Sequence, residues 1–268
     1  MLICYLHLEC LLIYSALAPG KPLLEFNTVS FLLLVVLGAF VQTVSGFALG
    51  LVIIAGATIL ELELIAFSAA VISLISLVNS SVALRTSYRN IDRSFLTYLC
   101  ITIMPGLLIG VALLTYLSEV HYFVLRVLLG IMVIVAGILL LLKPALYVQR
   151  SGKVSTSVFG ILGGVIGGLF SSGGSAWAYH LYRQPISVDV VRTTLLAVLV
   201  VSCIVRTIII TVAGQMTVSI LVTALISVPV VIAVTEVTSR NLSRIPDNIV
   251  RRLVVGLMTL TGFLLIFG

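Results

Sequence analysis

The chain has 268 residues, of which 61% are hydrophobic and 9% are charged, and its formal net charge is +6 at pH 7. Because soluble domains carry roughly 25% charged residues, this composition excludes an ordinary soluble domain and indicates a polytopic, all-helical membrane protein. The basic residues then mark topology rather than a nucleic-acid partner, and the four cysteines, scattered through apolar segments, predict no disulfide framework, metal or cofactor.

The N-terminal segment, residues 1–27, leaves two alternatives open. Residues 1–18 are apolar and end in Ala16-Leu17-Ala18, which resembles a signal-peptidase site. However, a basic start is missing and Glu9 interrupts the run. The segment is therefore either an extra membrane helix or a cleaved signal.

Eight apolar segments follow, with loops that are too short to hold a soluble domain. They span residues 29–59, 64–84, 94–117, 122–142, 154–182, 190–213, 216–237 and 249–267. Several approach or exceed the roughly 20 residues that a membrane helix needs, and none alternates as an outer-membrane strand does.

The second half of the chain resembles the first. The sequence from Arg126 to Met132 is matched by that from Arg252 to Met258, Pro105 by Pro229, and Ser45-Gly46 by Gly173-Gly174. Three matches in the same order indicate a duplication. We therefore expect a first repeat over residues 28–143, a cytoplasmic linker over 144–153 and a second repeat over 154–268.

Segments 29–59 and 154–182 are unusually long and contain breaks in their middle. The breaks are Gln42-Thr43-Val44-Ser45-Gly46 and Ser171-Ser172-Gly173-Gly174-Ser175. A bilayer tolerates such breaks only where protein or a water-filled cavity satisfies the freed backbone groups. Each segment could cross once as a broken helix, or turn at mid-depth and leave by the same side as a re-entrant hairpin.

The distribution of basic residues distinguishes these two topologies. If both segments cross, the loops divide their Lys and Arg seven against six; if both are re-entrant, the division is twelve against one. The residues counted are Lys21, Arg85, Arg89, Arg93, Lys143, Arg150, Lys153, Arg183, Arg192, Arg240, Arg244, Arg251 and Arg252. The positive-inside rule favours re-entrant segments and a cytoplasmic basic side. Each half then has three full crossings, so the halves form inverted repeats.

The two breaks predict an anion-binding site. The first amides of the outgoing half-helices, near Phe47 and Ala176, are unpaired and carry the positive end of the helix dipole. The expected substrate-binding residues at the breaks are Gln42, Thr43, Ser45, Gly46, Ser171, Ser172, Gly173, Gly174 and Ser175. The alternative is that small residues only allow close packing. We prefer that alternative for the glycines at helical spacing before the second break: Gly160, Gly163, Gly164, Gly167 and Gly168.

Three further polar residues lie within or close to membrane segments. Arg206 has no nearby acid in its segment, so its partner is a group on another helix or the transported anion, unless it is a snorkelling or structural arginine. Asn79 lies at the matching depth of the first half and is a second candidate for substrate binding. His180 could relay a proton, which makes H⁺ a candidate coupling ion, although a lone histidine is more often structural.

An enzyme and an ATP-driven pump are both disfavoured. Ser45 and His180 could imitate the dyad of an intramembrane serine hydrolase, but no residue that would orient the histidine can be identified. Nothing resembles a P-loop.

The two broken segments, together with Pro105-Gly106 and Pro229 in the third segment of each half, resemble the TauE/SafE family of sulfite exporters. The best local matches are Gly167-Gly168-Leu-Phe-Ser-Ser-Gly173-Gly174 and Thr43-Val-Ser-Gly46-Phe-Ala-Leu-Gly50. The resemblance covers about residues 28–268. The first motif departs from the family pattern because it lacks a run of adjacent glycines.

The resemblance implies secondary transport of a small sulfur-containing anion, sulfite or an organosulfonate, across the inner membrane. Broken helices of inverted repeats suit alternating access. An anion channel with a continuous polar pore is the main alternative. The sequence leaves the direction, the coupling ion and the oligomeric state open.

Overall fold

The computed structural model describes residues 26–62, 64–85, 87–141 and 149–241. Its elements are α2 (Phe26–Ser45), α3 (Leu49–Ile59), α4 (Ile65–Leu84), η1 (Tyr88–Asn90), α5 (Arg93–Val120), α6 (Tyr122–Leu141), α7 (Lys153–Phe170), α8 (Gly174–Tyr182), α9 (Val188–Val212) and α10 (Val218–Asn241). The expected last segment, 249–267, and most of the N-terminal segment lie outside the described residues.

Six of these helices, α2, α4, α5, α7, α9 and α10, are long and apolar enough to cross a membrane. The helices α3 and α8, with 11 and 9 residues, are too short for that. Pro105 and Pro229 lie inside α5 and α10. The predicted all-helical polytopic architecture is confirmed for the described residues.

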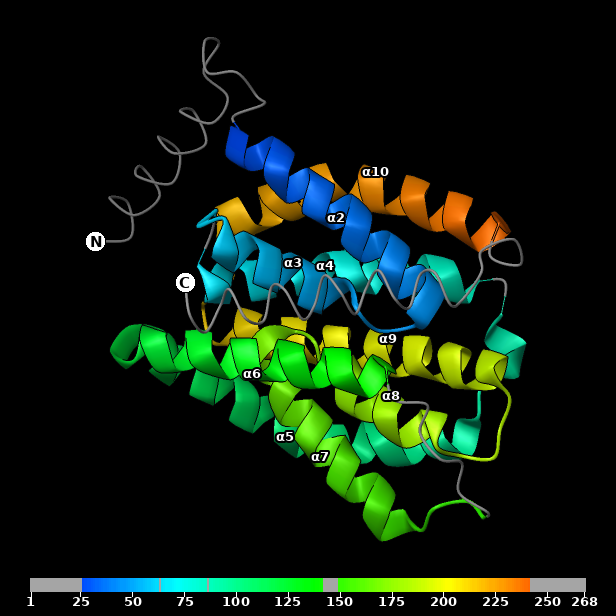
Figure 1. The fold of residues 1–268 in the computed structure, drawn as a ribbon. Coiled ribbons are helices and arrows are strands. Elements are labelled where there is room, and N and C mark those ends of the chain that lie inside the picture. Colours follow the sequence, from blue (N-terminus) through cyan, green and yellow to red (C-terminus); the bar gives the residue numbers. More distant parts are fainter. Residues whose placement is uncertain (1–25, 63, 86, 142–148, 242–268) are drawn as a thin grey trace.

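Both predicted breaks separate two helices that fold back on each other (Figure 1). The space left by Gly38 in α2 is bordered by Ile53 of α3, and Gly56 of α3 faces Leu34 of α2. Earlier residues of one helix thus meet later residues of the next, which is the pattern of an antiparallel pair. In the same way, Trp177 of α8 packs against Gly163 of α7. The chain therefore forms two helical hairpins, α2–α3 and α7–α8.

The first break lies slightly later in the chain than predicted. Residues 42–45 still belong to the last turn of α2, which ends at Gly46 because its φ of +88° is a conformation that glycine adopts without steric penalty. The helix α7 ends where Ser171 adopts a left-handed φ of +54°. That conformation is uncommon for serine, so surrounding contacts must hold it.

The helices α5 and α7 approach each other through glycines. A Cβ atom on Gly110 would lie 2.2 Å from the carbonyl oxygen of Val165 and 2.8 Å from the Cα of Gly168. A Cβ on Gly106 would lie 2.9 Å from the Cα of Gly164. The two backbones therefore touch, as small residues allow in membrane bundles. The predicted packing role is confirmed for Gly160, Gly163, Gly164 and Gly168, whereas a Cβ on Gly167 would have no neighbour closer than 3.4 Å.

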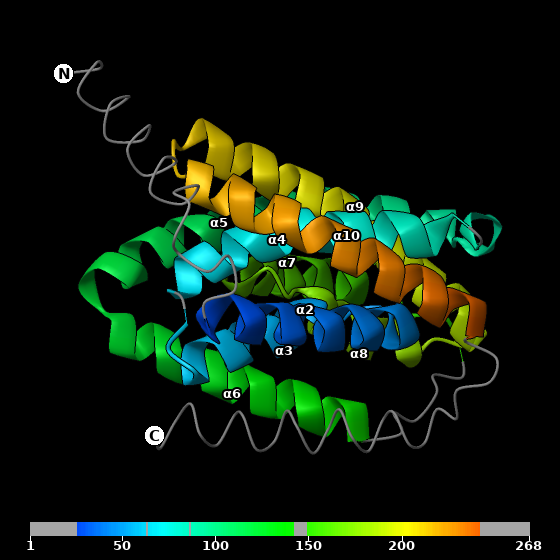
Figure 2. The ribbon, with the colours of Figure 1, turned by 90° about the horizontal axis from the view of Figure 1, so that it is seen from above.

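The loops divide into two groups at opposite ends of the bundle (Figures 1 and 2). At one end lie the α4–α5 loop, the residues before α7, the α8–α9 loop and the end of α10. We call it the basic end because it carries Arg85, Arg89, Arg93, Arg150, Lys153, Arg183, Arg192 and Arg240. The turns α3–α4, α5–α6 and α9–α10 lie at the opposite end, which carries Glu61 and Glu119.

The glycine contact predicts a position-specific effect on stability. In Gly164→Ala, the new methyl group would lie 2.6 Å from the carbonyl oxygen of Ile103, and such overpacking costs about 1–3 kcal/mol. In Gly167→Ala the nearest atom is 3.4 Å away, and alanine favours a helix by about 1 kcal/mol over glycine. Thermal unfolding in detergent should show a lower midpoint for Gly164→Ala only. Equal midpoints for the two variants would contradict the packing.

Candidate functional site

The two breaks meet inside the bundle. Gly50, in the first turn of α3, lies against the second break, since a Cβ at this position would be 2.8 Å from the carbonyl oxygen of Ser171. Gly174, at the start of α8, lies against the first break, with a Cβ position 2.6 Å from the Cβ of Phe47. The predicted convergence of the two breaks is therefore present in the structure.

The breaks lie at different depths. The helix α2 has 20 residues and is about 30 Å long, so the first break lies close to the basic end. There the hydroxyl of Tyr182, from the end of α8, donates to the carbonyl oxygen of Ser45. Ser171 instead contacts Ser73, near the middle of α4. The second break is the one that lies deep inside the bundle.

Arg206 connects the second break to α4. Its side chain, in α9, is 1% exposed. Nε donates to the carbonyl oxygen of Gly168 at 3.1 Å, and Nη1 donates to the carbonyl oxygen of Ala69 at 2.9 Å and to Ser73 Oγ at 2.6 Å. The hydroxyl of Ser73 also hydrogen-bonds that of Ser171 at 2.9 Å. Arg206 thus reaches the second break through Ser73.

All the partners of Arg206 are neutral. Within the described residues the guanidinium has no ion pair, and Nη2 has no hydrogen bond. An arginine at membrane depth costs about 2.5 kcal/mol or more without a counter-charge, and carbonyl contacts offset only the polar part of that cost. The arrangement leaves a buried positive charge that an anion would neutralise.

A cavity of about 290 Å³ reaches Arg206. Its wall includes Thr115 and Glu119 near the end of α5, and Gln215 in the α9–α10 turn. Gln215 Nε2 donates to Thr115 Oγ1 at 2.7 Å and so connects the two sides of the cavity. Because these residues belong to the end opposite the basic end, the cavity extends from that end to the buried guanidinium. Its size suits a small ligand.

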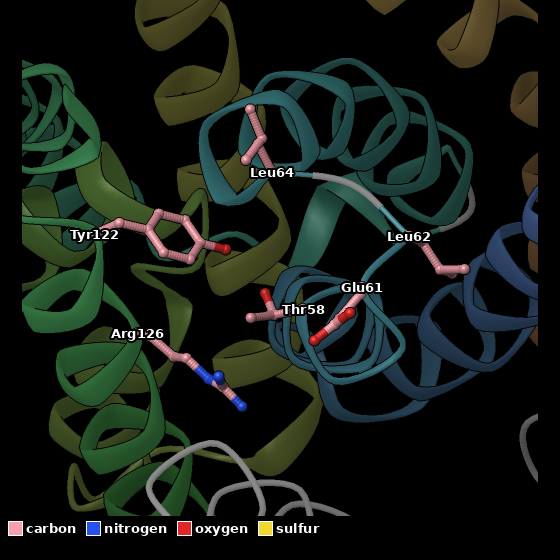
Figure 3. A pocket seen from close by; sticks show the side chains of 6 residues that line it. All are labelled: Thr58, Glu61, Leu62, Leu64, Tyr122 and Arg126. Carbon is pink, nitrogen blue, oxygen red and sulfur yellow. The ribbon is translucent and has the colours of Figure 1, made fainter. Parts of the chain in front are cut away.

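A second cavity, of about 380 Å³, lies at the same end between the α3–α4 turn and α6. Figure 3 shows Glu61 and Arg126 projecting toward it from the two sides, with Tyr122 and Thr58 nearby. Arg126 Nε is buried and has no hydrogen-bond partner in the described part of the chain. None of the residues that line this cavity also lines the cavity at Arg206.

Gln42 and Asn79 belong to a separate polar cluster between α2, α4 and α10. Gln42 Nε2 donates to Ser76 Oγ at 3.0 Å. Asn79 Nδ2 donates to Thr43 Oγ1 at 3.2 Å and to Thr235 Oγ1 at 2.7 Å. No hydrogen bond joins this cluster to Arg206 among the described residues. Asn79 lies six residues beyond Ser73 on α4, farther toward the basic end than the contacts of Arg206. Sequence reasoning gave no signal for Thr235, which lies 156 residues away.

The hydroxyl groups predicted to bind substrate at the breaks differ in whether they already have hydrogen-bond partners. Thr43 and Ser45 donate to carbonyl oxygens of their own helix at 2.7 Å, and Ser175 lies 3.5 Å from the carbonyl oxygen of Ser172. Ser172 is 1% exposed, and its hydroxyl has no partner in the residues described. Of these four, Ser172 therefore has the hydroxyl that is most available to a ligand.

His180 lies apart from Arg206, near the basic end. Its ring stacks on Phe159 at 4.9 Å between centroids, and Nε2 lies 3.1 Å from Thr156 Oγ1. The hydroxyl of Ser45 donates to its own helix, so the Ser45–His180 pair considered from sequence forms no hydrogen bond. A proton relay through His180 stays a prediction.

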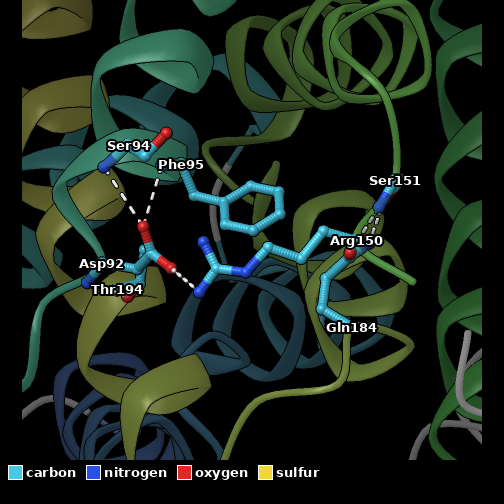
Figure 4. Close-up of polar contacts among 7 residues, drawn as sticks. All are labelled: Asp92, Ser94, Phe95, Arg150, Ser151, Gln184 and Thr194. Carbon is cyan, nitrogen blue, oxygen red and sulfur yellow. Dashed lines mark hydrogen bonds and ion pairs between the residues drawn. The ribbon is translucent and has the colours of Figure 1, made fainter. Parts of the chain in front are cut away.

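A set of contacts at the basic end, which we call the latch, joins the residues before α7 to three helices (Figure 4). Arg150 forms an ion pair with Asp92 at 3.0 Å, and the backbone N–H of Asp92 donates to Thr194 Oγ1 of α9 at 3.0 Å. The backbone N–H of Ser151 donates to Gln184 Oε1, just after α8, at 3.0 Å. The latch therefore links the residues before α7 to α5, α8 and α9 at this end.

The match to a family of known proteins includes both breaks and α9. The family model described as sulfite exporter TauE/SafE matches residues 31–265. A protein of Cupriavidus necator named probable sulfite/organosulfonate exporter TauE is 35% identical over 221 residues, which cover 82% of this chain and 86% of that protein. No solved structure matches the chain. A match over most of the chain, together with six helices in the described part that are long and apolar enough to span a membrane, places this multi-pass membrane protein in the TauE/SafE family of sulfite exporters.

Proposed function

We propose that the protein is a secondary transporter that moves a small sulfur-containing anion across the cytoplasmic membrane by alternating access. The observation that carries the proposal is the buried guanidinium of Arg206, which has only neutral partners and borders a cavity. The name of the Cupriavidus necator relative supports sulfite or an organosulfonate as the class of substrate.

In this proposal the anion binds where the cavity reaches Arg206. The guanidinium offers planar, forked N–H donors that suit an oxyanion. Ser171 and Ser172 belong to the second break, which does not line the cavity but is joined to Arg206 through Ser73. The first amides of α8 would add the positive end of a helix dipole. Sulfite and sulfonates share the oxygen acceptors that such donors need.

The same proposal includes the membrane topology. The helices α4, α5 and α6 follow the first hairpin, and α9 and α10 follow the second. We assign the basic end to the cytoplasm because of its arginines. With re-entrant hairpins, the two repeats would be inverted and would enter the membrane from opposite faces. Support comes from the two groups of loops, which lie at opposite ends of the bundle.

Alternating access is supported by the difference between the two ends. The cavity extends to Arg206 from the end opposite the latch, while the latch joins α5, α8 and α9 at the basic end. In the proposed cycle, this arrangement would correspond to a carrier open to the non-cytoplasmic side. Opening the latch, together with closure of the cavity, would expose Arg206 to the cytoplasm.

Exchange across a membrane tests the proposed function. We expect purified protein in liposomes to take up radiolabelled sulfite faster when unlabelled sulfite is present inside. The reason is that a carrier with sulfite bound reorients its binding site to the outside faster than an empty carrier does. The measurement is initial uptake with and without internal sulfite, with protein-free liposomes as the control. Flux that follows voltage alone and shows no stimulation would indicate a channel instead.

Arg206→Gln tests the binding role of the guanidinium. Because the anion would lose its counter-charge, sulfite or a sulfonate should no longer raise the unfolding midpoint of the folded variant. Arg206→Lys retains the positive charge but lacks the forked N–H donors of the guanidinium. In this variant the anion should still raise the unfolding midpoint, but by less than in the wild type. The matched control is Arg240→Gln, since Arg240 is exposed on α10. An unchanged shift in a folded Arg206→Gln protein would remove Arg206 from the site.

Asp92→Asn tests the latch without removing the helix cap. Asp92 Oδ1 accepts from the backbone N–H groups of Ser94 and Phe95, and asparagine caps helices as well as aspartate does. Only the ion pair with Arg150 is lost, so the cytoplasm-open state should gain population. We expect the apparent KM for cytoplasmic anion to fall a few-fold.

The partner variant makes this test specific. Arg150→Gln should have the same effect, and the double variant should add nothing, because both changes remove one interaction. Glu236→Gln, which breaks the exposed pair with Arg240, serves as the control. An equal change of KM in the control, or additive effects in the double variant, would argue against the latch.

A further inference from the structure

Arg192, in the second turn of α9, lies directly over the first break. A Cβ on Gly46 would be 3.1 Å from Arg192 Cγ and 3.4 Å from its Cα. The φ of Gly46 is +88°, so its backbone turns where the arginine side chain passes. The first break therefore packs against Arg192, whereas the second break is hydrogen-bonded to Arg206 through Ser73.

Arg192 also lacks a counter-charge. Its Nε atom is buried without a partner, and the described residues offer no hydrogen bond or ion pair to its guanidinium. Asp189, one turn earlier on α9, forms no ion pair with it. Among the described arginines at this end, Arg150 and Arg240 are the two that form ion pairs with described carboxylates. Arg192 thus shares with Arg206 a place at a hairpin break and the lack of a carboxylate partner in the described part of the chain, but Arg192 is half-buried whereas Arg206 is fully buried.

The spacing of the two arginines relates them geometrically. Arg206 follows Arg192 by fourteen residues in one continuous helix. Fourteen residues advance about 21 Å along an α-helix and return to within about 40° of the starting direction. Both arginines thus lie on one face of α9, one toward the basic end and the other deep in the bundle.

Two hydroxyl-bearing residues beside Arg192 add polar character to this region. Thr193 is fully buried, and its hydroxyl has no partner in the described ranges. Tyr182 holds the tip of the first hairpin through its hydrogen bond to the carbonyl oxygen of Ser45. This hydrogen bond therefore holds the tip of the first hairpin beside α9, with the turn at Gly46 against Arg192.

We infer that Arg192, at the Gly46 turn, is a second binding station for a small oxyanion on the cytoplasmic side of the Arg206 site. The inference rests on the proposed transport function and extends it. Arg192 captures the anion on the cytoplasmic side before the anion reaches Arg206, which lies deeper on the same face of α9. A forked guanidinium suits the sulfite or sulfonate group at both stations.

Sided transport kinetics of Arg192→Gln test this inference. With radiolabelled sulfite presented to the cytoplasmic face in oriented proteoliposomes, the apparent KM should rise about tenfold, as expected for the loss of one charged hydrogen-bond donor. The KM at the other face should stay unchanged, and sulfite should still raise the unfolding midpoint, because Arg206 is intact. Arg192→Lys should keep the cytoplasmic KM within about threefold of the wild type, because it retains the charge.

The controls separate this inference from the proposed function. Arg240→Gln removes another basic-end arginine, but an exposed one, and should leave both KM values unchanged. An unchanged cytoplasmic KM in Arg192→Gln, or equal increases at both faces, overturns the second station. If Arg192→Gln does not fold, Arg192→Lys decides the test. A folded Arg192→Lys protein that transports no more sulfite than protein-free liposomes would overturn the second station. Absence of sulfite exchange in the wild type would instead refute the proposed function.

Discussion

The buried charge of Arg206 is the constraint on which the rest of the structure depends. A guanidinium inside an apolar bundle is tolerated only if the surrounding backbone and side chains are arranged to receive its N–H groups. Here the carbonyl oxygen of Gly168 is exposed by the end of α7, and that of Ala69 faces α9. Ser73 adds a hydroxyl. These neutral partners orient the group but leave its charge for a ligand.

Close helix packing places those partners correctly. The carbonyl oxygen of Gly168 reaches Arg206 while the Cα of Gly168 touches α5 at Gly110, so a larger residue at either glycine would move the end of α7. The glycine contact and the anion site are therefore parts of one arrangement. Because membrane helices gain no hydrophobic driving force against each other, small residues and short contacts must supply that precision.

Sequence reasoning found the features that residue type reveals. An isolated arginine, two breaks in long apolar segments and glycines at helical spacing are visible in the chain, and the structure contains all of them in the expected elements. It could not identify Gly168 and Ala69 as partners of Arg206, because every residue has a carbonyl group. Sequence reasoning also assigned Asn79 to the anion site, from its depth and its place in the repeat. The structure puts Asn79 beside Thr235, six residues along α4 from Ser73. The first break lies nearer the basic end because α2 continues to Ser45.

Alternating access to Arg206 is the central claim, and reciprocal accessibility tests it most directly. Ala70 borders the cavity next to Ala69, so Ala70→Cys in a chain without native cysteines reports on the site. The measurement is its rate of reaction with a membrane-impermeant thiol reagent from each face. Weakening the latch should raise the rate from the cytoplasmic face and lower the rate from the other face. A cytoplasmic rate that rises with no fall at the other face would indicate a continuous pore and contradict the account.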